Sequence, residues 1–368
     1  MNDSKAWVHR WIRPEIRALS AYHVPDPGNL IKLDAMENPY RWPAEMVEEW
    51  LTLLRETPVN RYPDPDARGV KDALRAAMPI PAAAEILLGN GSDELIQMIA
   101  LALAGEGRSV LAPEPSFVMY RMIGLFTGMD YVGVALKGDD FTLDMPAMLA
   151  AIERHQPAVL FLAYPNNPTG NLWPEAEIRR LIEAAPGLVV VDEAYAPFAG
   201  ASLLGAVAEY PNLVVMRTVS KMGLAGLRLG LLVGDPRWLG EFDKVRLPYN
   251  INVLTQVSAR FALRHSAVFD AQTAEICRER ESLFEALATL PGITVYPSRA
   301  NFLLIRCPAG RADELFAALK ARGVLIKNLN GAGGRLTDCL RVTVGTPEEN
   351  RAFLAALVSS AALQYSSG

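Results

Sequence analysis

The sequence predicts an α/β protein: a large domain with a mostly parallel central sheet flanked by helices, followed by a smaller α+β domain. Three features support this prediction. Short runs rich in Val and Leu alternate with helical patterns from about residue 70, residues 250–290 look mainly helical, and residues 293–358 mix short strands with helices. Apolar runs of this kind suit parallel strands buried on both faces. Strands that alternate with helices are typical of a doubly wound sheet.

The predicted elements can be assigned in chain order. The large domain has predicted strands at Ser109–Ala112, Tyr131–Val134, Ala158–Ala163, Leu188–Val191, Leu213–Arg217 and Leu229–Val233, with helical patterns at Asp93–Ala104, Pro146–Arg154 and Pro174–Ala184. The smaller domain has predicted strands at Ile293–Tyr296, Phe302–Ile305 and Leu340–Val344, with helices around 311–322 and 347–361. A chain of 368 residues is long enough for two domains. We therefore divide it into an irregular N-terminal arm (1–47), a large domain (48–255) and a small domain (256–368).

Composition narrows the possible classes of function. The net charge of −5 argues against a nucleic-acid partner, which would favour a strongly basic domain. No stretch reaches the ~18 consecutive apolar residues of a membrane-spanning helix, and the N-terminal segment lacks the apolar run of a signal peptide. The 3 cysteines form no C-x-x-C pair and fit free thiols in a reducing compartment. We expect a cytoplasmic protein without a nucleic-acid or membrane partner.

A glycine-rich turn at residues 87–95 is the first candidate site. Open α/β sheets bind ligands beyond the carboxyl ends of their strands, so residues that follow strands are the ones to inspect. Here Gly91, Ser92 and Asp93 lie where a helix is expected to begin, and free N–H groups at a helix start can cradle a phosphate. The same residues also occur in ordinary strand-to-helix turns, and neither a complete G-x-G-x-x-G nor a P-loop is present.

Two further strands end in polar residues. Asn166 and Asn167 follow the strand at 158–163 and could hydrogen-bond a ligand, although Asn and Pro also mark simple turns. Asp192 follows the strand at 188–191, and a buried acid is costly unless it meets a cation. That cation could be a protein Arg or Lys in a structural ion pair, a metal, or a protonated ligand nitrogen. No metal is expected, because the 4 histidines show no ligand spacing.

Lys221 and Arg228 form the fourth candidate, after the strand at 213–217. Lys221 lies among small and apolar residues, where desolvation and nearby cations lower the pKa of an amine and favour Schiff-base chemistry. Arg228 lies in a glycine-rich segment whose backbone can approach a ligand closely. The alternative is an ordinary surface Lys and Arg.

Together and in this order, these motifs resemble those of the fold-type I aminotransferases that depend on pyridoxal 5'-phosphate (PLP). Within that group the chain is most similar to the histidinol-phosphate aminotransferases. The resemblance extends from Leu33-Asp34-Ala35-Met36-Glu37-Asn38-Pro39-Tyr40 to Leu340-Arg341-Val342-Thr343-Val344-Gly345-Thr346, and it includes Asn60-Arg61-Tyr62-Pro63-Asp64-Pro65 and Ser298-Arg299-Ala300-Asn301-Phe302. Agreement of several motifs across nearly the whole chain is far more specific than any one of them.

The resemblance implies roles around the PLP ring. Lys221 would form the Schiff base with PLP and move the Cα proton, and Asp192 would keep the pyridinium nitrogen protonated, which makes the ring an electron sink. Tyr195 and Asn167 would hydrogen-bond the phenolic oxygen of the ring. Phe117 would stack on the ring, although many relatives have Tyr there.

The resemblance also implies a phosphate site and a homodimer. The phosphate site would be formed by backbone N–H groups and side chains of Gly91, Ser92, Asp93, Thr218, Ser220 and Arg228. Tyr62 would reach the PLP phosphate from the partner subunit. The large domain would bind PLP, and the arm would join the small domain and the dimer interface.

The implied reaction is transamination of L-histidinol phosphate with 2-oxoglutarate, giving imidazole-acetol phosphate and glutamate, in histidine biosynthesis. Tyr22, Asn38, Lys327 and Arg341 would bind the substrate, with Arg341 resembling the Arg that grips the substrate carboxylate. Lys327 stands where an Arg that helps to bind the substrate phosphate is expected. Lys supplies the charge but not the bidentate fork of a guanidinium group.

Other activities would use nearly the same cofactor residues. They are an aromatic or broad-range amino-acid aminotransferase and a threonine-phosphate decarboxylase. A non-catalytic PLP-binding module, such as the ligand-sensing domain of a regulator, would be expected with a helix-turn-helix or basic domain, and the sequence shows neither. A dinucleotide-dependent oxidoreductase would need the complete glycine fingerprint that residues 87–95 lack.

Overall fold

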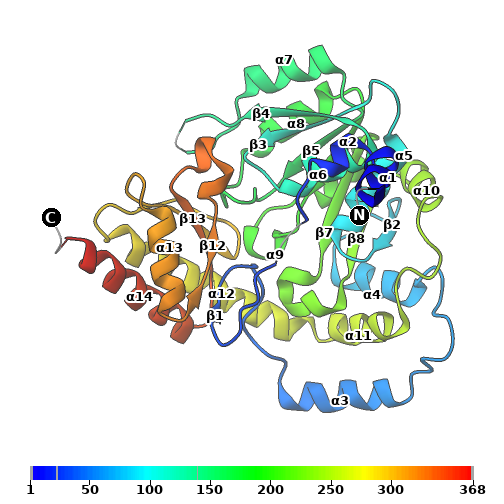
Figure 1. Cartoon of the computed structure of the whole chain (residues 1–368). Coiled ribbons are helices and arrows are strands. Elements are labelled where there is room, and N and C mark those ends of the chain that lie inside the picture. Colours follow the sequence, from blue (N-terminus) through cyan, green and yellow to red (C-terminus); the bar gives the residue numbers. More distant parts are fainter. Residues whose placement is uncertain (1–2, 22–23, 139, 366–368) are drawn as a thin grey trace.

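A computed structural model describes residues 3–21, 24–138 and 140–365 of the chain. Its centre is a seven-stranded sheet in the order β2-β8-β7-β6-β5-β3-β4 (Figure 1). The strands are β2 (Glu85–Gly89), β3 (Ser109–Glu114), β4 (Asp130–Ala135), β5 (Val159–Ala163), β6 (Leu188–Asp192), β7 (Leu213–Thr218) and β8 (Gly230–Gly234).

The strands of this sheet run parallel except for β8, which is antiparallel to both of its neighbours. Parallel neighbours need a long crossover connection. The segment between β7 and β8 is short and holds only the helical turns η2 (Ser220–Leu224) and η3 (Ala225–Leu227), so the chain reverses beside β7. As a result η2 and η3 lie at the edge of the sheet where β5, β6 and β7 end.

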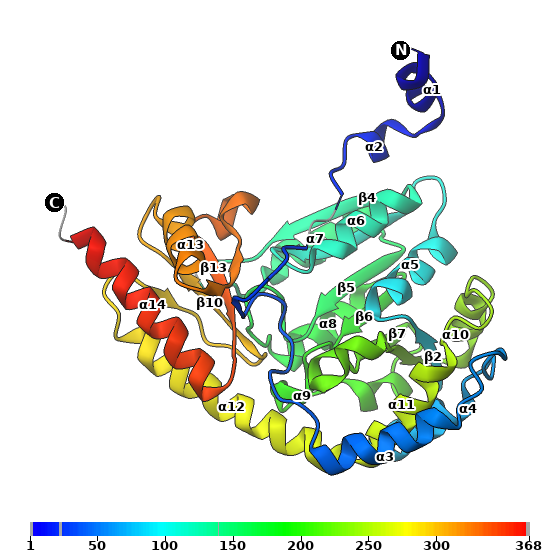
Figure 2. The same ribbon diagram turned by 60° about the horizontal axis from the view of Figure 1, so that its bottom comes forward.

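Both faces of the sheet are covered by helices (Figures 1 and 2). On one face pack α5 (Ser92–Leu103), α6 (Val118–Thr127) and α10 (Pro236–Asp243); on the other pack α4 (Arg68–Ala77), α7 (Met145–His155), α8 (Glu175–Ala184) and α11 (Val253–Arg264). Along β6, Val189 and Val191 belong to one buried cluster and Val190 to the other. This period of two is what a strand buried on both sides requires.

The long helix α12 (Ser266–Ala288) leads into a second, antiparallel sheet. Its order is β12-β13-β10-β9, from strands β9 (Thr294–Val295), β10 (Phe302–Arg306), β12 (Lys327–Asn328) and β13 (Cys339–Thr343). Helices α13 (Ala312–Ala321) and α14 (Pro347–Tyr365) follow β10 and β13 along the chain and share a buried core with this sheet.

The N-terminal part of the chain reaches this second sheet region through a two-residue strand. β1 (Ile31–Lys32) pairs in parallel with β11 (Val324–Leu325). Before it lie α1 (Asp3–Trp11) and α2 (Pro14–Arg17), and Figure 2 shows α1 standing clear of the main body. After it lies α3 (Ala44–Arg55), while the short α9 (Ala196–Ala199) follows β6.

The predicted fold class is confirmed: the structure has a mostly parallel sheet with helices on both faces and a smaller α+β part. Each predicted strand is present, and each of its ends lies within two residues of the predicted one. The sequence prediction omitted α6. The predicted boundary between residues 255 and 256 falls inside α11 and stays a prediction. Within the described residues, no helix is long and apolar enough to cross a membrane.

Candidate active site

A cavity of about 250 Å³ lies beyond the carboxyl ends of three parallel strands, where Ala163 ends β5, Asp192 ends β6 and Thr218 ends β7. Its walls bring together most of the residues that the resemblance assigned to the cofactor. These are Gly91, Ser92, Asp93, Phe117, Asn167, Asp192, Tyr195, Thr218, Ser220, Lys221 and Arg228.

Lys221 stands at the centre of this set, in the turn η2 that directly follows β7. Its Nζ donates a hydrogen bond to the carbonyl oxygen of Ala35 at 3.1 Å. Burial, together with the positive charge of Arg341, lowers the pKa of the Lys221 amine to about 8. Close to neutral pH the uncharged, nucleophilic form of this amine is therefore far more populated than for an ordinary lysine, as Schiff-base chemistry requires.

Asp192 is a buried acid without a cation. Its carboxylate accepts hydrogen bonds from the Tyr120 hydroxyl at 2.6 Å and from the Ala194 N–H at 3.0 Å. No Lys, Arg or His of the described residues makes a salt bridge with it. Burial consequently raises the pKa of Asp192 to about 6. A structural ion pair with a protein Arg or Lys is therefore excluded within the described residues. A ligand that carries a positive charge remains compatible with this site.

Tyr120 was missed by the sequence analysis. It lies on α6, three residues after Phe117, and its side chain is fully buried. Its ring stacks on Phe161 and meets Phe117 edge-on. The segment 118–127 is apolar and ends at Gly128, so a helix with a C-terminal glycine could have been recognised. The contact between Tyr120 and Asp192, however, spans 72 residues of sequence.

Asn167 links the cavity to the second sheet. Its amide nitrogen donates to the Tyr195 hydroxyl at 3.1 Å, and its amide oxygen accepts a hydrogen bond from Arg341. Arg341, which is 7% exposed, also donates to the carbonyl oxygen of Asp34 at 3.1 Å. The guanidinium group is thereby fixed beside the cavity, where its charge acts on Lys221.

The other end of the cavity is a tight cradle around Arg228. A Cβ atom on Gly91 would lie 2.6 Å from Nη2 of Arg228, and one on Gly230 would lie 2.6 Å from the backbone of Gly91. Glycine at both positions therefore lets the guanidinium approach the start of α5. In the same place the Oδ1 atom of Asp93 is buried without a hydrogen-bond partner, and burial raises the pKa of this acid. The Ser220 hydroxyl is within hydrogen-bonding distance of Thr218, at 2.8 Å.

These features fit PLP. The amine in a low-dielectric site suits the aldehyde of PLP, and the acid that lacks a cation suits its ring nitrogen. The glycine-lined cradle with an Arg suits its phosphate. Within the described residues, no group of three or more His, Cys, Asp or Glu could hold a metal ion.

The remaining predicted residues that the structure describes do not line this cavity. Tyr62 is 81% exposed and stacks on Tyr249, with ring centroids 4.4 Å apart. Asn38 donates to the carbonyl oxygen of Met222 at 3.2 Å and so contacts the Lys221 turn from outside. Lys327 pairs with Arg341 across neighbouring antiparallel strands, which places the two side chains on the same face. Tyr22 lies outside the described residues.

Three residues of the arm were not predicted to line the cavity but do so: Ala35, Met36 and Glu37. The backbone N–H of Met36 donates to Thr343 at 2.9 Å, and its carbonyl oxygen accepts from Asn301 at 3.0 Å. The second sheet thus holds this segment of the arm over Lys221.

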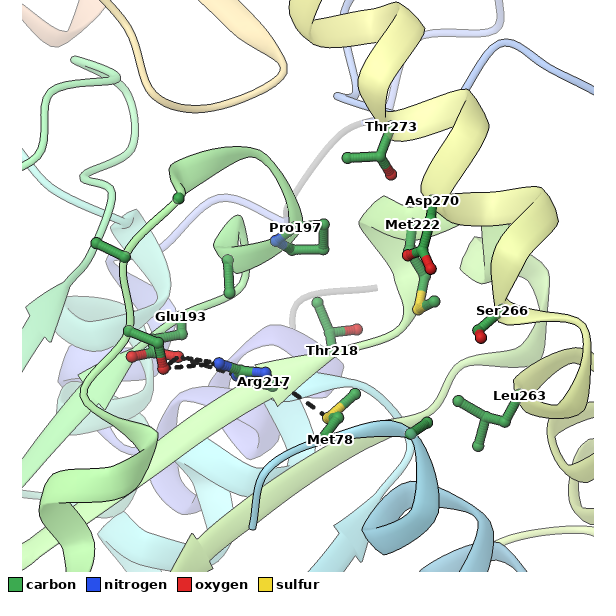
Figure 3. A pocket seen from close by; sticks show the side chains of 15 residues that line it. Met78, Glu193, Pro197, Arg217, Thr218, Met222, Leu263, Ser266, Asp270 and Thr273 are labelled. Atoms are coloured by element: carbon green, nitrogen blue, oxygen red, sulfur yellow. Dashed lines mark hydrogen bonds and ion pairs between the residues drawn. The ribbon is translucent and has the colours of Figure 1, made fainter.

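A second and larger cavity, of about 430 Å³, lies next to the first, and Thr218 lines both. Figure 3 shows the ion pair between Glu193 and Arg217 on one side of this cavity; its closest N–O distance is 2.7 Å. Glu193 also accepts hydrogen bonds from Ser202 and from the Leu203 N–H. Lys221 does not line this cavity, so the larger cavity lacks the reactive amine.

Comparisons with known proteins agree with this geometry. The family model described as aminotransferase class I and II matches residues 28–357. The chain is 60% identical over 354 residues to histidinol-phosphate aminotransferase 2 of Nitrosococcus oceani, covering 96% of this chain and 98% of the relative. It is 55% identical over 353 residues to the histidinol-phosphate aminotransferase of Chromobacterium violaceum, covering 96% and 98%.

Solved structures show the same fold. The histidinol-phosphate aminotransferase of Sinorhizobium meliloti, in complex with pyridoxal-5'-phosphate, matches with a TM-score of 0.84 and 24% identity, covering 96% of this chain and 98% of that one. The enzyme of that name from Clostridium acetobutylicum matches with a TM-score of 0.82 and 22% identity, covering 90% and 98%. The family resemblance predicted from the motifs is confirmed. This chain belongs to the class I and II aminotransferase family.

Proposed function

We propose that this protein transaminates L-histidinol phosphate with 2-oxoglutarate, giving imidazole-acetol phosphate and glutamate in histidine biosynthesis. The observation that carries the proposal is a single cavity that holds an amine of lowered pKa, Lys221, and a buried acid without a cation, Asp192. This cavity occurs in a chain that is 60% identical, over 96% of its length, to a curated histidinol-phosphate aminotransferase.

The cofactor of this reaction is PLP, which supplies an aldehyde carbon for the substrate amine and a ring that accepts the electron pair of the broken Cα–H bond. Asp192 would hold the proton on the ring nitrogen, and Tyr195 and Asn167 would hydrogen-bond the ring oxygen. Phe117 would pack on the face of the ring. The phosphate would be held by Arg228 with Thr218 and Ser220, and by the N–H groups of Gly91, Ser92 and Asp93 at the start of α5.

Lys221 has two tasks that its environment supports. Its uncharged amine would hold the cofactor through the aldehyde carbon that the cofactor supplies. The same amine, once freed by the substrate, would take the proton from the substrate Cα and give it to that cofactor carbon. Both tasks need an amine that is not permanently charged. The low-dielectric site and the nearby charge of Arg341, which lower its pKa, meet this need.

The substrate site must accept two different anions. Histidinol phosphate presents a phosphate and no α-carboxylate, whereas glutamate presents an α-carboxylate. We propose that Arg341 binds the anionic group in both half-reactions and that Lys327, beside it on β12, adds a second positive charge for the phosphate. Asn38 would act by holding the Lys221 turn, and Tyr22 would complete the substrate site from the arm.

We further propose a cytoplasmic homodimer in which Tyr62 reaches the partner's PLP phosphate. Within one chain Tyr62 does not line the cavity. Its ring is exposed and stacks on the ring of Tyr249, which is also exposed, and apolar surface of this kind commonly marks interfaces. The cysteines 277, 307 and 339 are free, which suits a reducing compartment.

Subunit exchange tests the shared site. Lys221→Ala protein and Tyr62→Ala protein, each inactive alone, should regain activity when mixed, because one site of each hybrid dimer has both residues intact. A fully active monomer in sedimentation would overturn the homodimer.

Substrate competition tests the reaction itself. The measurement is kcat/KM for histidinol phosphate beside phenylalanine and tyrosine, each with 2-oxoglutarate. Histidinol phosphate should be preferred by at least about tenfold. If an aromatic amino acid is preferred by that margin, the protein is an aromatic aminotransferase. Release of CO₂ from threonine phosphate would instead identify a decarboxylase.

A further inference from the structure

Tyr120 is hydrogen-bonded to Asp192, and the sequence motifs assign it no role. Its hydroxyl donates to Oδ2 of Asp192 at 2.6 Å, the short distance expected of an O–H group bonded to a carboxylate. Its ring is fixed from two sides, by stacking on Phe161 at 4.6 Å and by an edge contact with Phe117 at 5.5 Å between centroids. Because these two contacts fix the Tyr120 ring, its hydroxyl can fix the position of the Asp192 carboxylate.

The charges around Asp192 oppose its ionisation. Asp93 at the start of α5 and Glu193 next along the chain are both negative and disfavour the carboxylate, and so does desolvation. Two donors favour it: the Tyr120 hydroxyl from α6 and the Ala194 N–H. The other titratable groups that line the cavity are Glu37, Tyr195, Lys221 and Arg228. Tyr120 therefore supplies one of the two hydrogen bonds that favour the charged form of this buried acid.

We propose that Tyr120 is a positioning residue for the transamination, whose hydroxyl holds the Asp192 carboxylate ionised and in place to bind the protonated ring nitrogen. This inference rests on the proposed binding of PLP but not on the identity of the amino donor. Tyr120 touches neither the substrate nor the reacting carbon and acts through Asp192.

Tyr120 remains a donor under working conditions. Complete burial and the adjacent carboxylate raise the pKa of the phenol well above its ordinary value, so the proton stays on the tyrosine oxygen and the negative charge on Asp192. The hydrogen bond thus points from Tyr120 to Asp192 at every pH at which the enzyme would operate. Losing it should raise the pKa of Asp192 by on the order of one to two units.

The test is Tyr120→Phe, which removes the hydroxyl and preserves both ring contacts. We expect PLP to bind the apoprotein about tenfold or more weakly, as measured by fluorescence titration. We also expect kcat to fall with little change in KM, and the acid limb of the kcat profile to move to higher pH by about one unit or more. A purely structural role would move neither the acid limb nor the ratio of kcat to KM in this way.

Tyr131→Phe is the matched control. Tyr131 on β4 is also largely buried beside a carboxyl group, Glu114, but it does not line the cavity. Its loss should leave PLP affinity and the acid limb unchanged. The proposal is overturned if folded Tyr120→Phe protein keeps PLP affinity within twofold of the original and an unshifted acid limb.

If the Phe variant does not fold, Tyr120→His gives the second measurement, because an imidazole N–H can donate to the same carboxylate. Recovery of PLP affinity in the His variant supports the proposal. Failure to recover it, or failure of both variants to fold, overturns it, since the hydroxyl would then serve the fold alone. Failure of the proposed substrate is distinguishable, because PLP affinity is measured without any amino donor.

Discussion

Two consecutive acids at the end of β6 have opposite surroundings. Glu193 is 1% exposed and forms an ion pair with Arg217 at 2.7 Å, supported by Ser202 and the Leu203 N–H. Asp192 is 4% exposed and, among the residues that the structure describes, accepts hydrogen bonds from only two donors, both neutral. The protein itself supplies the cation that neutralises Glu193, whereas the cation for Asp192 would have to come from a ligand. Since both are costly to bury, an acid left without a cation is the more informative sign of a functional site.

The two cavities repeat this contrast at larger scale. The larger one, about 430 Å³, contains the matched pair of Glu193 and Arg217, and the smaller one, about 250 Å³, contains Lys221 and Asp192. Size alone would select the wrong cavity. The reactive amine of Lys221 and the buried acid without a cation, Asp192, select the smaller one.

The largest effect should follow removal of the amine in the smaller cavity. Lys221→Ala should abolish the near-visible absorbance of the lysine-bound cofactor and reduce kcat by roughly a thousandfold or more, because both the nucleophile and the proton carrier are lost. Stopped-flow absorbance and steady-state assays measure these effects. Lys244→Ala, on an exposed pair with Glu241, is the control. Full activity of the Lys221 variant would end the assignment.

Asp192→Asn should reduce kcat by on the order of a hundred- to a thousandfold, because an amide cannot keep the ring nitrogen protonated. The apoprotein should nevertheless be as stable as the original or more so, since a desolvated charge has been removed. Chemical denaturation of the apoprotein beside transamination kinetics separates the two effects. A strongly destabilised apoprotein would mean that Asp192 has a structural role like that of Glu193.

Glu193→Gln should show the reverse pattern. It leaves Arg217 without its carboxylate in a largely buried site, which should lower the free energy of unfolding by about 3 kcal/mol. PLP affinity should change little, because Glu193 does not line the smaller cavity. The readouts are the denaturant midpoint and a PLP titration. Loss of PLP affinity without loss of stability would contradict the division between the two acids.

Lys327→Ala removes a positive charge beside the proposed substrate site. It should lower kcat/KM for histidinol phosphate by roughly ten- to a hundredfold, since a charge-assisted contact contributes about 1.5–3 kcal/mol. The effect on phenylalanine, which carries no phosphate, should be smaller. Lys320→Ala, an exposed residue of α13, is the control. Equal losses for both amino donors would show that Lys327 does not recognise the phosphate.

The smallest effect concerns pH and the stability of the apoprotein. Burial raises the pKa of Asp192 to about 6, above an ordinary value of about 3.9. Between these values the folded state binds the proton more tightly than the unfolded state, so raising the pH costs stability. From pH 5 to pH 7 the loss from this group should be about 1 kcal/mol. It should appear as the difference between the original protein and Asp192→Asn, and a difference that does not change with pH would contradict it.

Local patterns were enough to predict much of this molecule. Each buried strand is a short apolar run, and the polar residues that follow β5, β6 and β7 converge because parallel strands end at the same edge of a sheet. This is why Asn167, Asp192 and Lys221 could be placed together from their order alone. The resemblance to a family then supplied roles that spacing could not.

The tertiary structure decided which buried charged side chains form ion pairs. Asp192 and Glu193 are neighbours in sequence, and no local pattern tells which one meets Arg217. Likewise the hydroxyl of Tyr120 reaches Asp192 across 72 residues, and Ala35 of the arm accepts from Lys221 across 186 residues. The sequence by itself determined the fold class and the residues that approach the cavity, because periodicity and turns are local. Pairing between distant side chains depends on how the layers pack, and only the folded chain reveals it.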